Sequence, residues 1–372
     1  MEKQKFLVLG AGPAQIDLIE LLKPNFEVHA CSYDRSDLGV DDAVKYEQID
    51  LKDKEAVLKY CQNQQINYIY SVGSDLAMPT AAWVSKQLEL PSLIDAETAH
   101  VCQNKDLLRE KLSDLKENVP YQLVTHSQQR LELDFPVIIK PVDSQGQRGV
   151  RKISSKQEFS RHFLSAAAHG QRHEVICEQY LPGQEYSVNA FARAGRVELA
   201  IITKRVVYPE YPGGLIHLHS TEHGLSHDLQ ITINKSVETV ISKLNINNGP
   251  VYFQIKIVNG QPKVIEVSPR LDGCHLWRLF THSHHIDLLT ASVELLIGGE
   301  QSELQLKNSY LPEDGKHWVL EFFSTLPGTI FSKQNFNVRD DTVFNQFYYN
   351  DGEEVGVTNG YLEKCGYQIY QV

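Results

Sequence analysis

The chain of 372 residues is long enough for two or three domains and a large hydrophobic core. It is 42% apolar and 22% charged, the ordinary globular range, and its net charge of −11 argues against a nucleic-acid or anionic-membrane surface. A local basic pocket for nucleotide phosphates remains compatible with that charge. Six scattered cysteines without a C-x-x-C pair fit reduced thiols in a cytoplasmic protein. We find no signal-peptide pattern at residues 1–5 and no apolar run of transmembrane length.

The first 95 residues alternate between predicted strands and predicted helices. The strands are expected at residues 6–9, 27–31, 46–49 and 68–72. The helices are expected at about residues 15–22, 54–62 and 79–88. This alternation is typical of a doubly wound parallel-sheet domain.

Two glycine loops lie at the carboxyl edge of this predicted sheet. Gly10-Ala11-Gly12, with Asp34 after the second strand, is close to a dinucleotide-binding fingerprint, but Gln15 stands where the third glycine belongs. We therefore expect a glycine-rich turn without a bound dinucleotide. The second loop, Gly73-Ser74-Asp75, either faces a substrate or caps the next helix.

Two lysines precede a third glycine-rich loop. Lys105 lies on a helix predicted at about 99–112, where it can equally be a solvated surface residue. Lys140 interrupts the apolar strand 136–141, and a lysine buried there needs an anion. The loop 143–150, DSQGQRGV, follows directly and can present backbone N–H groups to phosphates, although it is not a Walker A loop.

The next strand ends in a turn. Residues 174–181, EVICEQYL, run into Pro182-Gly183, and a period-two pattern resumes at 185–191. Backbone groups of Gln179–Leu181 could hold an adenine edge, with Glu185 on ribose hydroxyls. An ordinary hairpin with surface acids explains the same residues, so both interpretations stay open at this point.

Histidines mark two further segments. His217 and His219 fall at period two in a strand, but no third metal ligand is evident, so a substrate-facing or surface role explains them better. After a helix expected at about 235–244 and a hairpin, we expect His282–His285 to open a helix that runs to Ile297 as surface groups of its first turn.

The hairpin at residues 249–273, GPVYFQIKIVNGQPKVIEVSPRLDG, carries the strongest signal. Glu266, Ser268 and Arg270 recur at period two and therefore share one face of a strand. An arginine there suits a phosphate or acyl-phosphate oxygen. A buried ion pair would explain a lone acid and arginine, but several polar groups on one face favour a binding site.

The register of this hairpin decides which residue joins that face. A three-residue loop at 259–261 would pair Val258 with Pro262 and place Gln254 directly across from Glu266. A two-residue loop would turn Gln254 away. We predict the odd-length loop, because it gathers Gln254, Glu266, Ser268 and Arg270 into one patch. The amide and carboxylate oxygens of Gln254 and Glu266 suit Mg²⁺.

The order of these motifs resembles the ATP-grasp superfamily, particularly its carboxylate–amine ligase and carbamoyl-phosphate-synthase-like branches. Lysine helix, lysine strand, glycine loop, E-x-Y-L and E-V-S-P-R follow one another in the chain. The resemblance implies a mixed α/β and α+β fold. It consists of a Rossmann-like pre-ATP-grasp domain at 1–95 that does not bind NAD, a two-lobed ATP-grasp domain at 96–299 with a lid at about 115–177, and a β-rich C-terminal segment at 300–372.

The resemblance also assigns roles to matching positions. Phosphate and loop contacts to ATP would come from Lys105, Lys140, Ser144, Gln145, Gly146 and Gly149. Adenine and ribose contacts would come from Glu178, Gln179, Tyr180, Leu181 and Glu185. The metal ligands would be Gln254, Glu266 and Ser268, and the catalytic residues Glu266 and Arg270. By position only, the substrate contacts would be His217, His219, Asp272 and His275.

Two of the metal positions depart from the family pattern. Ser268 falls where the family usually has Asn or Asp, and Gln254 falls where it more often has an acid. Glu266 is then the one anionic ligand, which predicts weaker affinity for a second Mg²⁺ or an extra water in its shell. Mn²⁺ is the alternative ion.

The resemblance implies a cytoplasmic ATP-dependent ligase that activates a carboxylate as an acyl phosphate, releases ADP and phosphate, and joins the acyl group to an amine. Its partners would be the small-molecule carboxylate and amine, with no nucleic acid and no membrane, and related enzymes are often homodimers. Two alternatives are a bicarbonate-activating enzyme that makes carboxyphosphate and a nucleotide-binding regulatory protein of weak activity.

Overall fold

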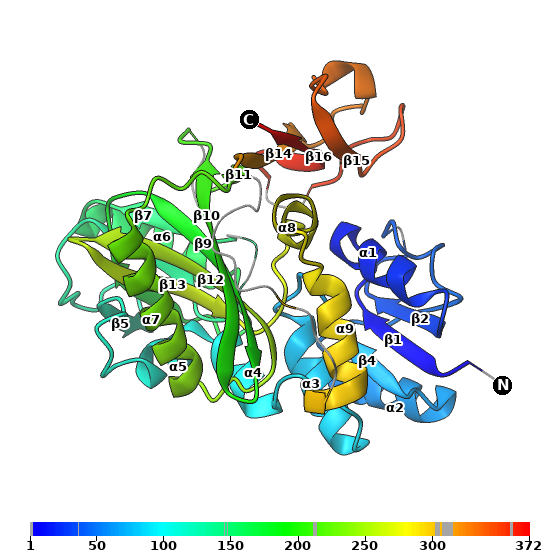
Figure 1. Ribbon diagram of the computed structural model, residues 1–372. Helices are drawn as coiled ribbons and strands as arrows, with labels where there is room; N and C mark the ends of the chain where they lie inside the picture. Colours follow the sequence, from blue (N-terminus) through cyan, green and yellow to red (C-terminus); the bar gives the residue numbers. More distant parts are fainter. Residues whose placement is uncertain are drawn as a thin grey trace.

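The computed structural model describes residues 3–35, 37–144, 146, 148–210, 214–301, 306, 315–357 and 360–372. The predicted loop residue Gln145 lies outside this part of the chain. Within the described residues, helices cover one parallel sheet and two antiparallel sheets (Figure 1). This mixture confirms the predicted α/β and α+β class.

The N-terminal sheet has four parallel strands in the order β3-β2-β1-β4. The strands are β1 Lys5–Leu9, β2 Glu27–Ser32, β3 Lys45–Gln48 and β4 Tyr68–Tyr70. The helices are α1 Pro13–Leu22, α2 Lys54–Gln64 and α3 Ala77–Gln87. Phe6 and Val8 pack on the side of α1, whereas Leu7 and Leu9 pack against α2 and α3. Both faces of the sheet are therefore covered, as the alternating pattern predicts.

The predicted helix around Lys105 is broken, so the prediction of one continuous helix was wrong. It consists of α4 Ala96–Gln103 and α5 Lys105–Lys111. Asn104 separates them with extended backbone, φ −97° and ψ 111°. The N–H of Lys105 donates instead to the carbonyl oxygen of Val142 at 2.9 Å, which ties the first lysine to the end of the lysine strand.

A small antiparallel sheet with the order β5-β8-β6-β7 occupies the region predicted as a lid. Its strands are β5 Tyr121–Val124, β6 Val137–Pro141, β7 Arg151–Ile153 and β8 Val175–Gln179. Helix α6 Lys156–Ala167 begins at the capping residue Ser155 and buries Phe159 and Phe163 against the sheet. The small sheet thus has a core of its own.

The large antiparallel sheet has the order β13-β12-β9-β10-β11-β14-β16-β15. Its strands are β9 Glu185–Arg193, β10 Arg196–Val207, β11 Ile216–Ser220, β12 Gly249–Val258, β13 Gln261–Ser268, β14 Trp318–Thr325, β15 Thr342–Phe347 and β16 Glu363–Gln371. The remaining helices are α7 His227–Lys243, α8 Leu276–His284 and α9 Leu288–Gly298, with short 3₁₀ turns at Gly299–Gln301 and Lys333–Asn335. The C-terminal strands extend this sheet at the β11 edge (Figure 1). None of the described helices combines the length and apolarity needed to cross a bilayer.

Two helix predictions need correction. Helix α7 begins at His227 rather than near residue 235, because Ser226 Oγ accepts the N–H of Leu229 and caps it. The histidines His282–His285 end α8 instead of opening a helix. His285 adopts left-handed backbone with φ 54°, and Asp287 then caps α9.

The loop of the β12–β13 hairpin has two residues, so the predicted three-residue loop was wrong. Val258 pairs with Gln261. Asn259 and Gly260 have φ values of 50° and 75°, and two positive φ values in a row are the requirement of a type I′ turn.

A β-bulge nevertheless places Gln254 across from Glu266, as predicted. Ile255 pairs with Val264, so Ile265 is an extra residue on β13 that shifts the register by one. The predicted pairing is therefore correct, and the bulge rather than the loop produces it.

Candidate active site

Polar side chains gather on one face of the large sheet, which we call the polar floor. Every second residue of β9 points to this face, and the residues of β10 and β12 that pair with them point the same way. Strand β13 adds the two residues that pair with Gln254 and Tyr252. The polar floor consists of Glu185, Ser187, Asn189, Thr203, Arg205, Tyr252, Gln254, Lys256, Glu266 and Ser268. Most of these side chains are buried, and Asn189 Nδ2 and Arg205 Nε lack a hydrogen-bond partner within the described residues. Buried polar groups in this number indicate a ligand-binding surface.

Glu185 lies at the centre of a charged cluster on the polar floor. Its Oε2 accepts a hydrogen bond from Gln254 Nε2 at 2.8 Å and pairs with the guanidinium of Arg205, and Lys256 Nζ is 3.4 Å from its Oε1. Burial would raise the pKa of Glu185, but Arg205 and Lys256 outweigh burial and lower it. The carboxylate is therefore ionised and already engaged, and its contact with ribose stays a prediction.

The anion that Lys140 needs is supplied by the protein. Lys140 Nζ is 2.6 Å from Oε2 of Glu178, and Arg109 Nε is 2.8 Å from Oε1 of the same carboxylate. All three side chains are buried. Burial alone would raise the pKa of Glu178, but the two cations outweigh it and lower the pKa to about 2. Glu178 thus balances the charge of two cations. The sequence places it in the adenine segment and does not predict this role.

Arg109 is a residue that the sequence did not reveal. Its Nη1 donates to the carbonyl oxygen of Val264 at 2.8 Å, and its Nη2 donates to that of Ile265 at 2.7 Å. These carbonyl groups belong to the β-bulge, so Arg109 fixes the distortion that sets the pairing of the hairpin. The sequence did hold one sign that a buried cation such as Arg109 is needed. Glu178 is an acid inside the apolar strand VICEQ, and a buried acid needs a cation beside it.

Arg270 is buried beside the loop that follows β4. Its Nη2 is 2.6 Å from Asp75 Oδ2, and its Nη1 donates to the carbonyl oxygen of Leu271 at 3.3 Å. The centre of the Tyr252 ring lies 5.5 Å from the guanidinium carbon. Burial would raise the pKa of Asp75, but the charge of Arg270 and hydrogen bonds from Arg270 and Ser268 outweigh it and lower that pKa. An ionised Asp75 therefore faces the predicted catalytic arginine.

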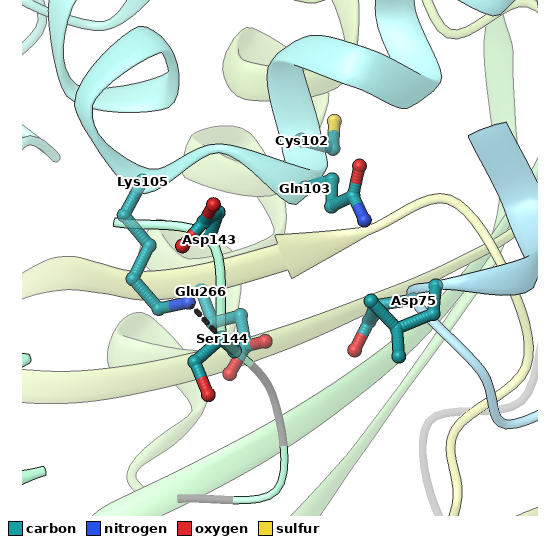
Figure 2. Close-up of a pocket in the computed structure, with 8 residues that line it drawn as sticks. Asp75, Cys102, Gln103, Lys105, Asp143, Ser144 and Glu266 are labelled. Carbon is teal, nitrogen blue, oxygen red and sulfur yellow. Dashed lines mark hydrogen bonds between the residues drawn. The ribbon is translucent and has the colours of Figure 1, made fainter. Parts of the chain in front are cut away.

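A pocket opens between the hairpin, the loop after β4, the loop after β6 and the junction of α4 with α5 (Figure 2). It is lined by Asp75, Leu76, Cys102, Gln103, Lys105, Asp143, Ser144 and Glu266. Lys105 Nζ donates to the carbonyl oxygen of Ser144 at 2.6 Å, the dashed contact in Figure 2. The pocket thus joins the loop after β4, the segment between α4 and α5, the loop after the lysine strand, and the hairpin.

The segment Gln179–Leu181 lies where the small sheet meets the polar floor. The Tyr180 ring has Lys152 Nζ of β7 at 3.8 Å from its centre and Lys256 Nζ of β12 at 5.5 Å. Lys256 also donates to the carbonyl oxygen of Leu181 at 2.9 Å. The segment is therefore held from both sheets, and its contacts with adenine stay a prediction.

The glycine loop after β6 has left-handed backbone at Gly146 and Gly149, with φ values of 66° and 75°. A Cβ at Gly149 would lie 2.9 Å from Pro141 Cγ and 3.0 Å from His169 Cδ2, whereas a Cβ at Gly146 would meet no atom within 4 Å. Gly149 is therefore required by packing and Gly146 only by conformation. Ser144 Oγ is buried without a hydrogen-bond partner in the described part of the chain.

The three predicted metal ligands offer oxygen atoms of the kind that Mg²⁺ prefers. Gln254 Nε2 donates to Glu185, so its amide oxygen is not used in that contact, and the residue pairs across the hairpin with Glu266. Ser268 lies on the same face, two residues after Glu266. In the described residues, no group of three or more His, Cys, Asp and Glu side chains could hold an ion. A bound Mg²⁺ would therefore depend on amide, hydroxyl and phosphate oxygens, with one carboxylate.

His217 and His219 have separate surroundings. His219 is buried with Nδ1 at 3.4 Å from Thr203 Oγ1, and burial holds its pKa well below the usual value, so it is neutral. His217 has Nε2 at 3.1 Å from Glu321 Oε1, and its ring lies tilted against that of Tyr208 with ring centres 4.6 Å apart. The two histidines contact different partners and do not form a metal pair. In the register of β10 and β11, His219 lies opposite Arg205 of the polar floor.

Asp272 and His275 are engaged within the protein. The carboxylate of Asp272 accepts the N–H groups of Cys274 and Leu276 at 2.9 and 3.0 Å, which shapes the turn before α8. His275 is buried, and its Nε2 lies 2.9 Å from the hydroxyl of Tyr348 in the C-terminal segment. Their predicted substrate contacts stay predictions.

Gln15 covers the first glycine turn. Its Nε2 donates to the carbonyl oxygen of Val72, and a Cβ at Gly10 would lie 3.0 Å from its Cδ. The space that a pyrophosphate needs against such a turn is therefore filled by this side chain.

Residues 133–276 match the family described as "ATP-grasp domain". They include the lysine strand, the glycine loop, the polar floor and Arg270. This segment is therefore similar to the ATP-grasp domain, and the resemblance to the ATP-grasp superfamily that the sequence predicts is confirmed.

Particular relatives extend this likeness. Dapdiamide A synthase of Enterobacter agglomerans is 26% identical over 236 residues, which cover 59% of this chain and about half, 54%, of that protein. An L-amino acid ligase from Bacillus licheniformis superposes with a TM-score of 0.78 at 16% identity, covering 100% of this chain and 94% of that one. The biotin carboxylase domain of Hydrogenobacter thermophilus 2-oxoglutarate carboxylase, solved with MgADP and bicarbonate, superposes with a TM-score of 0.78 at 12% identity, covering 100% and 87%. At these identities the two structures establish the fold.

Proposed function

We propose that this chain is an ATP-dependent carboxylate–amine ligase, which forms an acyl phosphate and passes the acyl group to an amine with release of ADP and phosphate. The observation that carries the proposal is the pairing of Gln254 with Glu266 on the polar floor. Glu266 and Lys105 line one pocket, and Arg270 pairs with Asp75, another residue of its lining. The names of dapdiamide A synthase and the L-amino acid ligase favour an amino acid or a related carboxylate as the acyl donor.

ATP and Mg²⁺ are the cofactors of this proposal. The MgADP bound to the similar biotin carboxylase domain supports this choice. When bound, Mg²⁺ would supply positive charge to the phosphate oxygens, and Gln254, Glu266 and Ser268 would hold it. Lys105 and the loop from Ser144 to Gly149 would contact the phosphates.

The protein's own charges would stabilise the phosphoryl group as it moves. Arg270 is only 6% exposed, and a guanidinium shielded from water acts strongly on developing negative charge. Lys140 adds a second cation, with Glu178 balancing it until phosphate arrives. The segment Gln179–Leu181 would hold adenine and Glu185 the ribose.

The proposed reaction also requires that water be kept from the active site, because water would hydrolyse the acyl phosphate. The small sheet and its glycine loop would close over the nucleotide. We take 1–95, 96–299 and 300–372 as working domain boundaries, with the lid at about 115–177. A cytoplasmic location and a homodimer complete the proposal.

The test is a coupled assay for ADP with Mg²⁺, ATP and a panel of carboxylates and amines. ADP and phosphate release that requires both a carboxylate and an amine supports the proposal. Formation of AMP and pyrophosphate would overturn it. Turnover with bicarbonate and no amino acid would move the assignment to a carboxyphosphate-forming enzyme.

A further inference from the structure

The loop after β4 is seated tightly against the end of the hairpin. The N–H of Gly73 donates to the carbonyl oxygen of Leu271 at 3.2 Å. Gly73 has φ 67°, and a Cβ there would lie 2.9 Å from Ala14 Cβ and 3.2 Å from Gly273 Cα. Because no side chain fits at Gly73, backbone packing sets the position of the residues that follow it.

The next two residues of the loop have different tasks. Ser74 Oγ accepts the N–H of Ala77 at 3.2 Å at the start of α3. Asp75 turns its carboxylate to Arg270, and its side chain lines the pocket together with Glu266 (Figure 2). Helix capping and a contact with the site, the two interpretations of this loop, are therefore divided between neighbouring residues.

The guanidinium of Arg270 is held on two nitrogens and open on the third. Asp75 takes Nη2, and the carbonyl oxygen of Leu271 takes Nη1. Nε is buried and has no hydrogen-bond partner among the described residues. A buried charge needs a counter-charge, and a planar group held at two corners has its third donor fixed in direction.

We propose that Asp75 is a positioning residue, through which the N-terminal segment orients Arg270 toward the terminal phosphate of ATP. The inference rests on the proposed function, because it assigns Arg270 to that phosphate. Asp75 acts through Arg270 and need not touch the substrate itself.

The test compares two nucleotides by calorimetry on the full-length protein with Mg²⁺. We expect Asp75→Asn to weaken binding of AMP-PNP about tenfold, because one charge-assisted contact loses its orientation, and to leave ADP affinity within about twofold. Asp75→Glu should recover part of the loss. Arg270→Gln combined with Asp75→Asn should lose no more AMP-PNP affinity than Arg270→Gln alone, since the two residues act as one unit.

A matched control is Ser74→Ala, which removes the contact to Ala77 in the same loop and keeps Asp75. It should leave both affinities within about twofold of wild type. Equal loss of ADP and AMP-PNP affinity in Asp75→Asn, no loss of either, or the same selective loss in Ser74→Ala would overturn the proposal. Failure of the proposed ligase activity appears separately, as absent substrate-dependent ADP release by the wild-type protein that still binds both nucleotides.

Discussion

Arg109 Nε lies 2.8 Å from Glu178 Oε1, while the same guanidinium holds the two carbonyl groups of the β-bulge in β13. The first contact reaches β8 of the small sheet, and the second reaches the polar floor. One buried cation therefore joins the sheet that would close over the nucleotide to the hairpin that would hold its metal.

Replacing Arg109 should destabilise the protein strongly. We expect Arg109→Met to lower the free energy of unfolding by about 3–5 kcal/mol, because it leaves Glu178 with Lys140 alone and two carbonyl groups without a donor. Arg109→Lys should lose less, since it keeps the charge but not the forked geometry. Urea unfolding of both variants measures this, and a loss below about 1 kcal/mol for Arg109→Met would contradict the assigned role.

The lowered pKa of Glu178 predicts loss of stability in acid. Its pKa falls from 4.5 to about 2, so its contribution is fully present above pH 4.5 and is lost as the pH falls toward 2. We expect the free energy of unfolding to decline less steeply over this interval in Glu178→Gln than in wild type. Asp17, whose pKa also lies at about 2, preserves part of the slope.

The control for this acid effect is Glu238→Gln, at an exposed position of α7. It should keep the wild-type dependence on pH. Identical slopes for wild type and Glu178→Gln would show that Glu178 does not drive the acid effect.

Glu266 is the one predicted carboxylate ligand of the metal, so its neutral amide should impair turnover. We expect Glu266→Gln to reduce kcat for ADP formation at least about 100-fold, because charge on the transferring phosphoryl group is left less neutralised. Steady-state kinetics over a range of Mg²⁺ concentrations measures this. Glu294→Gln, an exposed glutamate of α9, should behave as wild type. A near wild-type rate in Glu266→Gln would show that the metal site is elsewhere.

The two glycines of the phosphate loop offer a matched pair of substitutions. Gly146→Ala should cost about 1–2 kcal/mol at most, because left-handed backbone is its only constraint. Gly149→Ala should cost more and weaken ATP binding, because the added Cβ meets Pro141 and His169. Unfolding in urea and calorimetry with ATP measure both effects. Equal behaviour of the two variants would mean that packing at Gly149 has no consequence.

The sequence predicted those helices and strands that a periodic pattern of neighbouring residues marks. The alternation of strands and helices in the first 95 residues, the lysine strand and the two strands of the hairpin all appear where their periodicity places them. Gln254 and Glu266 face each other as predicted, although the β-bulge rather than the predicted loop produces this pairing.

What the sequence could not predict depends on contacts between distant residues. The bulge at Ile265 is held by Arg109, which lies 156 residues earlier in a short charged helix that looks like a surface helix. Asp75 meets Arg270 across 195 residues. At the break, the N–H of Lys105 bonds to the distant carbonyl oxygen of Val142. Asn104 is a favoured helix-cap residue, but one such residue does not by itself show that a helix ends there.

Strand β11 is covered on one side by strands that come last in the sequence and are therefore synthesised last. Its neighbour β14 begins only at Trp318, after every residue proposed to touch a ligand has been synthesised. A nascent or truncated chain that stops before this strand holds all those residues and still exposes an unpaired sheet edge, and His275 lacks its partner Tyr348. We expect such fragments to pair with other chains and aggregate, because the last strands are what covers this edge in the complete sheet.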